Sequence, residues 1–378
     1  MADLSTPVFI EKTPDEIINE MVARYEQLTE KTLFPAQVEK LLISVMAYQE
    51  HLDIIAINEA AKQNLVAFAT APVLDYLGQN VGITRLPPAQ AYCDVVFSFQ
   101  PGHGNLILPA GLRVRSQDGL VVFVTDVATS VASSVNEVTV ACSCQTEGVV
   151  GNGYAPGDIS VILDPQPYLT GAQNSTETEG GSDEESDSNL RQRIFFAFAQ
   201  SATAGSYSSY RFYALSANPG IIDVFIAGPG EPGFSEAPSP GNVHIYPLME
   251  GGVDTPLQVL NQVFNACNAE DVRPLTDTVN VFSPEGVDYD IEVELTLLNT
   301  ADQQSVTDSV NSALQAYAQG RLSALGLDIT EDSITALCMI DGVYSVDVIS
   351  PASDLIIDFN EFGRNQSITV TVAALTNG

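Results

Sequence analysis

Residues 180–224 constrain the fold more than any other stretch, because they combine a loop, two helices and a strand in a fixed order. The acidic start of this stretch can cap a helix and suits the positive end of a helix dipole. Apolar residues then recur every three or four positions over residues 190–198, which predicts an amphipathic helix. Gly205 breaks the pattern, Ser206 can cap a second helix, and a β-prone run follows at 221–227. We therefore expect a loop, a helix, a break, a second helix, a turn and a strand.

The composition is that of a chain that folds and that has many more acidic than basic residues. The chain has 378 residues, of which 45% are hydrophobic, enough for several domains with their own cores. Its 14 basic and 48 acidic residues give a net charge of −34, which repels phosphate backbones and anionic membranes. We therefore expect no nucleic-acid partner and no membrane partner. Two readings of the charge stay open, namely solubility and the docking of a basic partner.

The five cysteines are sparse and odd in number, so they do not indicate a disulfide framework. Cys142 and Cys144 share one face of an alternating run with no histidine nearby, so we expect reduced core thiols and no metal site. No apolar run approaches the roughly 20 residues of a membrane span. The N-terminus also lacks the apolar stretch of a signal peptide.

Residues 1–85 are predicted to be helical. Thr13 can cap a first helix, a second helix is expected over residues 35–69, and a short third one over 72–79. The second helix carries a seam of apolar residues in alternating steps of three and four: Val38, Leu41, Val45, Tyr48, Leu52 and Ile55. This seam has two readings, a helical bundle formed between subunits and an ordinary hairpin within the chain.

Residues 86–170 are predicted to form a small β-sandwich or barrel, because short alternating strands with glycine punctuation run through them. The Gly-rich residues 148–157 resemble a phosphate-binding loop, but they lack its lysine ending and a following helix, so we expect a turn. Residues 165–188, which are polar and acidic, are predicted to be a linker.

The rest of the chain is predicted to hold two α/β modules. Residues 171–285 contain part of the linker, the two-helix segment and the first module, and residues 286–378 form the second. The modules share an order of elements, and we expect their sheets to be mainly antiparallel. The fold class is therefore α+β and multidomain, with an N-terminal helical bundle segment, a small β-sandwich or barrel, a central two-helix segment and two C-terminal α/β modules.

No pattern in the sequence indicates catalysis. The three histidines, His51, His103 and His244, lie far apart, and the motifs of zinc hydrolases, serine hydrolases and dinucleotide-binding enzymes are missing. Asp288 and Asp290 share one strand face, where they repel each other rather than catalyse. We expect no enzyme activity, no cofactor, no metal and no small-molecule substrate.

The central stretch resembles the signature of baseplate J-like proteins, which are wedge components of contractile phage tails and related injection systems. The resemblance continues through Pro240-Gly241, residues 272–277 and Gly342-Val343, and it covers most of residues 65–378. The residues that carry it are Gly181, Glu185, Asp187, Leu190, Arg191, Arg193, Gly205, Tyr210, Asp223, Arg273, Pro274, Asp277 and Gly342. For Arg191 and Arg193 two readings stand, exposed helix charge or a structural role in tying the acidic loop to the helix.

The resemblance implies a structural wedge subunit that forms a ring around the central hub and rearranges to trigger sheath contraction. It implies as partners a second wedge protein in a shared helical bundle, neighbouring copies, and hub and sheath-proximal proteins. It also implies a location in the virion, at the tail baseplate, after assembly in the host cytoplasm. Two alternatives stay open, an equivalent wedge subunit of a non-phage contractile injection system and a receptor-binding tail fibre.

Overall fold

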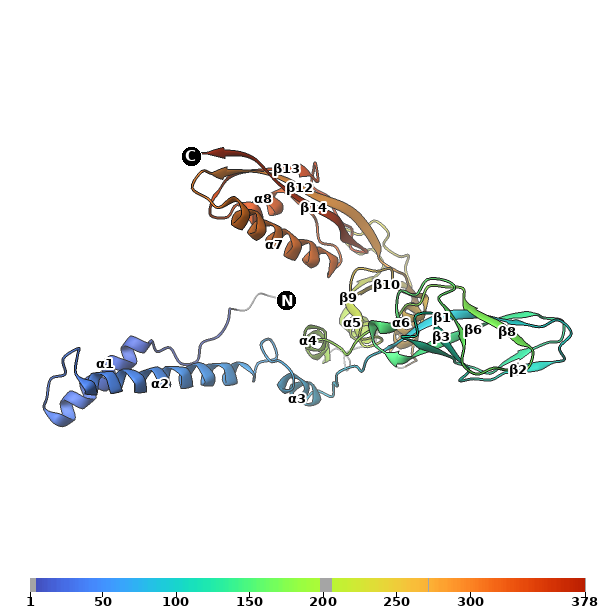
Figure 1. The fold of residues 1–378 in the computed structure, drawn as a ribbon, viewed down its shortest axis with the longest axis horizontal. Helices are drawn as coiled ribbons and strands as arrows, with labels where there is room; N and C mark the ends of the chain where they lie inside the picture. Colours follow the sequence, from blue (N-terminus) through green and yellow to red (C-terminus); the bar gives the residue numbers. More distant parts are fainter. Residues whose placement is uncertain (1–4, 198–205, 271, 378) are drawn as a thin grey trace. The chain divides into compact units, whose positions relative to one another are not determined.

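The computed structural model describes residues 5–197, 206–270 and 272–377, and the chain divides into two units (Figure 1). The first unit is Met1–Thr84 together with Leu190–Ile194, and the second is Arg85–Asn189 together with Phe195–Gly378. The multidomain α+β class is confirmed. The finer domain boundaries stay predictions.

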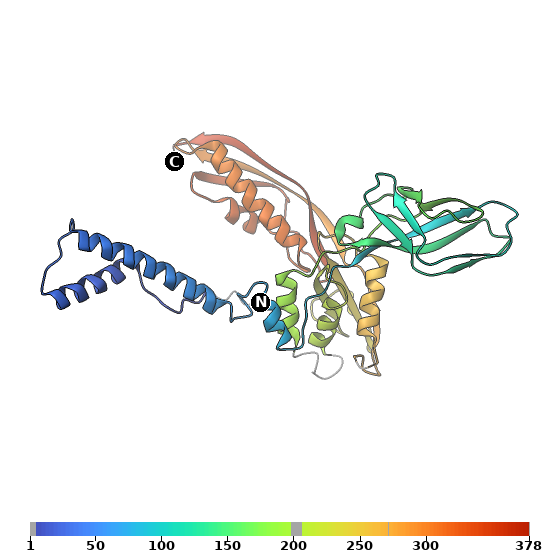
Figure 2. The same cartoon turned by 60° about the horizontal axis from the view of Figure 1, so that its bottom comes forward.

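The first unit contains three helices before residue 84: α1 (Pro14–Thr29), α2 (Val38–Lys62) and α3 (Val73–Gln79). Thr13 caps α1 in a capping box, because its hydroxyl accepts from the Glu16 amide while the Glu16 carboxylate accepts from the Thr13 amide. Helix α1 then lies along α2 in both views (Figures 1 and 2), and the two pack through buried Ile17, Ala47 and Ile54.

The predicted length of the second helix, residues 35–69, is wrong at both ends. The chain before Val38 forms a turn in which the Gln37 amide donates to the Phe34 carbonyl. After Lys62 the chain leaves the helix, and the Gln63 side chain accepts from the Thr70 amide at 2.9 Å. Side-chain hydrogen bonds to the backbone thus end a pattern that periodicity alone would continue.

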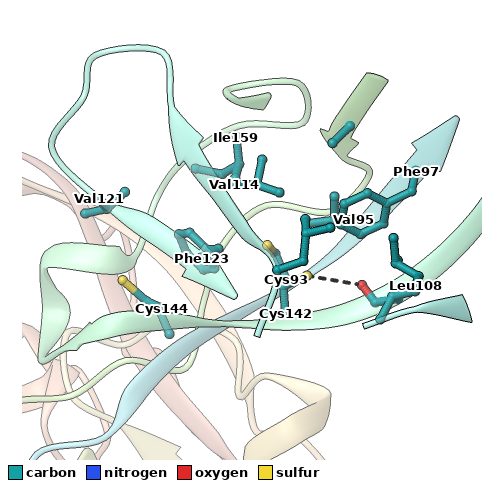
Figure 3. Close-up of a cluster of buried hydrophobic side chains, with 14 of the residues drawn as sticks. Cys93, Val95, Phe97, Leu108, Val114, Val121, Phe123, Cys142, Cys144 and Ile159 are labelled. Atoms are coloured by element: carbon teal, nitrogen blue, oxygen red, sulfur yellow. Dashed lines mark hydrogen bonds between the residues drawn. The ribbon is translucent and has the colours of Figure 1, made fainter. Parts of the chain in front are cut away.

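The β-domain is a six-stranded sheet in the order β7-β3-β4-β6-β1-β8, with a separate β2–β5 pair. Its strands are β1 (Gln90–Phe99), β2 (Leu106–Leu108), β3 (Arg113–Ser116), β4 (Val122–Thr125), β5 (Thr129–Val131), β6 (Glu137–Glu147), β7 (Ile159–Ile162) and β8 (Leu169–Asn174). All pairs are antiparallel. The end strands approach each other where the Asn174 carboxamide oxygen accepts from the Ile159 amide, so the sheet nearly closes into a barrel. Alternate residues such as Val95, Phe97 and Phe123 fill the interior (Figure 3).

The prediction that residues 165–188 form a linker is wrong for β8. This polar strand pairs with β1, and its Ala172 and Asn174 are buried. The Asn174 side chain donates to the carbonyls of Ala155 and Thr176, which satisfies a polar group in the interior. A short strand whose buried positions are polar or small carries no apolar alternation, so the sequence did not reveal it.

Among the described residues, the central segment has the predicted order of helix, second helix, turn and strand. Its elements, with the rest of the first module, are α4 (Asp187–Phe196), α5 (Tyr207–Leu215), β9 (Ile221–Ala227), β10 (Asn242–Met249), α6 (Leu257–Cys267) and β11 (Thr278–Val281). Ser186 accepts from the Asn189 amide at the start of α4, and Ser206 caps α5 through the Ser209 amide. The predicted break at Gly205 lies outside the described residues.

The second module has one helix-covered sheet face and one open face. Its elements are β12 (Glu285–Leu298), α7 (Gln303–Leu322), α8 (Glu331–Cys338), β13 (Val343–Ser350) and β14 (Glu361–Thr376). Alternate residues of β12, including Ile291, Val293 and Leu295, pack with Val310 and Leu314 of α7. The acidic residues between them point to the other face and are exposed.

The expectation of mainly antiparallel sheets is wrong. Each module has one antiparallel and one parallel pair, with the parallel pairs being β10–β11 and β12–β14. The helices in the connections allow this, since parallel neighbours need a crossover. The modules also differ in order, because α6 follows the second strand of its module while α7 follows the first strand of its own.

Candidate functional site

Helix α2 exposes the whole predicted seam. Its six residues are 39–68% exposed, although they are large and apolar: Val38, Leu41, Val45, Tyr48, Leu52 and Ile55. The hairpin contact with α1 uses other positions of the same helix, among them Ala47 and Ile54. Helix α2 thus has one apolar stripe covered within the chain and a second one that no described part of its own unit covers. Such a continuous apolar surface is typical of a protein–protein contact. Whether the seam forms a bundle between subunits stays a prediction.

Two signature residues, Glu185 and Asp187, are held by a residue that sequence reasoning missed, Arg85. Its guanidinium donates to the Asp187 carboxylate at 2.7 Å and to the Glu185 carbonyl oxygen at 2.6 Å. The Glu185 side chain, which is 2% exposed, accepts from the Leu86 amide at 2.9 Å. The segment before the barrel is thereby fastened to the acidic loop about a hundred residues later in the chain. An arginine fork suits this geometry, because it can hold two oxygens at once.

Arg191 and Arg193 both donate to backbone carbonyls, and the predicted partner of Arg191, the acidic loop, is wrong. Arg191 donates to the carbonyl oxygens of Val66 and Ala69, each at 2.8 Å. Arg193, which is buried, donates to the Thr84 carbonyl at 3.1 Å. All of these residues belong to the first unit, as does buried Leu190. These carbonyls lie outside the helices α2 and α3, and the guanidinium groups supply hydrogen-bond donors to them.

The structure brings together Tyr210, Arg273, Pro274 and Asp277 of the first module. The Tyr210 hydroxyl donates to the Asp277 carboxylate at 3.1 Å, and Arg273 donates to the Asp277 carbonyl at 2.6 Å. The Asp277 amide in turn donates to the Pro274 carbonyl at 3.1 Å. Burial and the nearby Asp277 charge raise the pKa of Tyr210, so this hydroxyl stays a hydrogen-bond donor at neutral pH.

The other described signature residues have contacts of their own. Asp223 pairs with Arg211, a second residue that the sequence did not single out, and accepts from the Leu325 amide at 3.0 Å. Gly342 has a φ of +94°, and a Cβ there would lie 2.9 Å from that of Ala301. A Cβ at Gly181 would lie 2.5 Å from the Gly148 carbonyl oxygen. Gly205 lies outside the described residues. Gly181 and Gly342 thus limit which side chains the backbone can accept, and Asp223 connects β9 to the chain at Leu325.

The contacts and pKa shifts of three titratable side chains, His103, His244 and Cys93, describe their surroundings. The two ring nitrogens of His103 lie 2.6 Å from the Gly104 carbonyl oxygen and 2.9 Å from that of Val135. Burial lowers the pKa of His244. Burial raises the pKa of Cys93 to about 12, so its thiol is protonated and unreactive at neutral pH. Within the part of the chain that is described, no three His, Cys, Asp or Glu side chains gather closely enough to hold a metal ion. None of the described helices combines the length and apolarity needed to span a membrane.

Comparison with known proteins gives four matches to family models that follow one another along the chain. They are the baseplate J-like N-terminal domain at residues 38–91, the barrel domain at 94–181, the central domain at 202–283 and the C-terminal domain at 289–371. Baseplate protein J of Escherichia phage P2 is 29% identical over 231 residues, which is 60% of this chain and 70% of that protein. A chain in the 6-fold symmetrised cryo-EM structure of the anti-feeding prophage baseplate is similar over 93% of this chain and 90% of its own, with 14% identity and a TM-score of 0.36.

Proposed function

This chain belongs to the baseplate J-like family, and from that premise we propose that it is a structural wedge subunit of a contractile phage tail baseplate. In this role it would form part of the ring around the central hub and rearrange to trigger sheath contraction. The similarity to baseplate protein J of phage P2 favours a phage tail over a non-phage injection device. The virion would be its location, after assembly in the host cytoplasm.

The observation that carries the proposal is the exposed seam of α2. A helix that leaves six large apolar residues in water on one stripe, while another stripe is already packed, has a surface suited to a further helix. We propose that a second wedge protein supplies it, and that the two form a shared bundle. Burying Val45 alone, which is 68% exposed, would contribute about 1–2 kcal/mol. The other five residues of the seam would add to this contribution, which must exceed the free-energy cost of association.

The proposed role is mechanical and involves binding without chemistry. Contraction requires two arrangements of the ring that are close in free energy, and contacts that differ between them. The chain would contribute by holding its neighbours, its own copies, the hub and sheath-proximal proteins, through surfaces on its several domains. The strong negative charge would favour basic surfaces among these partners.

The seam can be tested with two matched substitutions in the full-length chain. Val45→Asp places a charge in the seam, and Leu28→Asp places one at a position of α1 that is 76% exposed and outside it. We expect both variants to keep the helical circular dichroism of the parent. Co-expression with the other tail proteins, followed by affinity capture and electron microscopy, should show that only Val45→Asp loses the wedge complex. Normal assembly of Val45→Asp would contradict the bundle.

A further inference from the structure

Strand β14 ends the sheet of the second module with a free edge. The sheet order is β13-β12-β14, so β14 pairs with β12 on one side, and no described strand pairs with it on the other (Figure 1). The strand is 16 residues long. An edge of this length presents a row of backbone donors and acceptors to water, which makes it a template for another strand.

Two irregularities divide this edge and leave one regular stretch between them. The pairing with β12 shifts between Asn365 and Ser367, and again between Val372 and Ala374. Bulges of this kind protect edges, because they disturb the ladder that an incoming strand would extend. Residues 367–372 lie between the two shifts and contain no charge, proline or glycine. This stretch therefore lacks the usual protection.

The two faces of residues 367–372 differ in chemistry. Ile368, Val370 and Val372 pack on the helix-covered core but stay partly exposed at the sheet edge. Ser367, Thr369 and Thr371 alternate with them and are exposed on the open face. A strand added here would bury the exposed parts of Ile368, Val370 and Val372. Every second side chain of the added strand would then lie on the open face of the sheet.

The open face next to this edge is acidic and incompletely paired. Glu292 and Glu294 lie opposite Thr369 and Thr371, and Glu294 is also directly opposite Asp347 of β13. Like charges directly across a strand pair are destabilising. Asp288 pairs with Arg364, and Asp290 accepts from the Ser367 hydroxyl. No cation among the described residues pairs with Glu292, Glu294 or Asp347.

We propose that residues 367–372 of β14 bind an extended segment of another protein by strand addition, and that this segment alternates apolar with basic residues. The backbone edge would supply the hydrogen bonds, and the carboxylates would select the cations. The added strand would lie about 4.8 Å from β14 and about 10 Å from β12, a distance that a lysine or arginine side chain can span. A second copy of the chain fits less well, because its β14 carries no cation between the two shifts and its β12 would add more carboxylates. The inference does not depend on the wedge assignment.

The test uses fluorescent peptides and the full-length chain. We expect a Lys-Val repeat peptide to bind saturably by fluorescence anisotropy, and a Glu-Val repeat to bind much less. A Lys-Val peptide that is N-methylated at alternate residues keeps its charge but cannot form the ladder, so we expect it not to bind. The triple variant Glu292→Gln, Glu294→Gln, Asp347→Asn should weaken the Lys-Val peptide about five- to tenfold at low salt. The matched control Asp308→Asn, on the exposed side of α7, should leave it unchanged.

Three results would overturn the proposal. Equal binding of the N-methylated peptide would show attraction by charge alone, without a strand. If the Glu-Val peptide binds as tightly as the Lys-Val peptide, the carboxylates of the open face do not contribute to recognition. Sedimentation that shows a dimer of the chain which excludes the peptide would assign this edge to a second copy.

Discussion

Replacing Arg85 with alanine should weaken the contact between the acidic loop at Glu185 and Asp187 and the segment at Arg85 and Leu86. The substitution removes two charge-assisted hydrogen bonds, to Asp187 and to the Glu185 carbonyl. Such bonds contribute roughly 1.5–3 kcal/mol each. The Arg85 and Asp187 side chains are 13% and 31% exposed, so water replaces part of what is lost. We expect a local loss of about 2–4 kcal/mol.

Amide hydrogen exchange, measured by mass spectrometry, reports the loss of local stability at individual peptides. The peptide that contains Leu86, whose amide donates to Glu185, should exchange about 30- to 800-fold faster in Arg85→Ala than in the parent. The matched control is Arg113→Ala. Arg113 also forks onto a carboxylate, that of Asp164, but their side chains are 47% and 32% exposed. Its removal should change the exchange of its own strand little.

Two results would refute this reasoning. Unchanged exchange at Leu86 in Arg85→Ala would show that the guanidinium does not hold the loop. Equal acceleration of exchange around Arg85 and Arg113 in their respective variants would show that burial does not set the strength of these pairs.

Three other predictions follow from the signature residues. Gly342→Ala should lower the thermal midpoint by an amount equivalent to about 2 kcal/mol or more, because its φ of +94° and the close Ala301 Cβ both oppose a side chain; an unchanged melting curve would contradict this. Folding raises the pKa of the Tyr210 hydroxyl above its ordinary value of about 10. The protonated hydroxyl therefore contributes fully to stability below about pH 10, and this contribution is lost as the pH rises towards the pKa in the folded chain. In urea titrations, Tyr210→Phe should be less stable than the parent at pH 7, because the bond to Asp277 is missing. Between pH 10 and 11 the variant should lose less further stability than the parent, and an equal loss in both proteins would refute the prediction. Arg191→Ala should impair capture of wedge partners more than it lowers the melting temperature, and equal loss of both would reject the role.

Local signals in the sequence predicted the elements well. Thr13 with Glu16, and Ser206 before the second signature helix, are caps that act within three residues, so their outcome depends on neighbours that the sequence shows. The β-character of residues 86–170 was likewise visible, because short alternating strands run through them. Strand β8 was missed because its buried residues, Ala172 and Asn174, are small or polar and give no apolar alternation.

The contacts of the signature residues could not be predicted in the same way. Arg191 bonds carbonyl oxygens more than 120 residues earlier, and every residue type has a carbonyl, so no pattern marks the partner. Arg85 follows no helix or strand motif, and only the fold brings it to Asp187. The parallel pairing of β12 with β14 also depends on the path of the helices between them, which sequence periodicity does not record.

The division of helix α4 has a practical meaning for anyone who wishes to shorten this protein. Leu190–Ile194 belong to the first unit, although the chain on both sides of them belongs to the second. Removing residues 1–84 would therefore remove Gly78, which lies next to Ile194, and both carbonyl acceptors of Arg191. Ile194 and Arg191 themselves would remain, within the truncated chain. The first unit includes residues from two separate parts of the sequence, so point substitutions are a better way to study it than truncation.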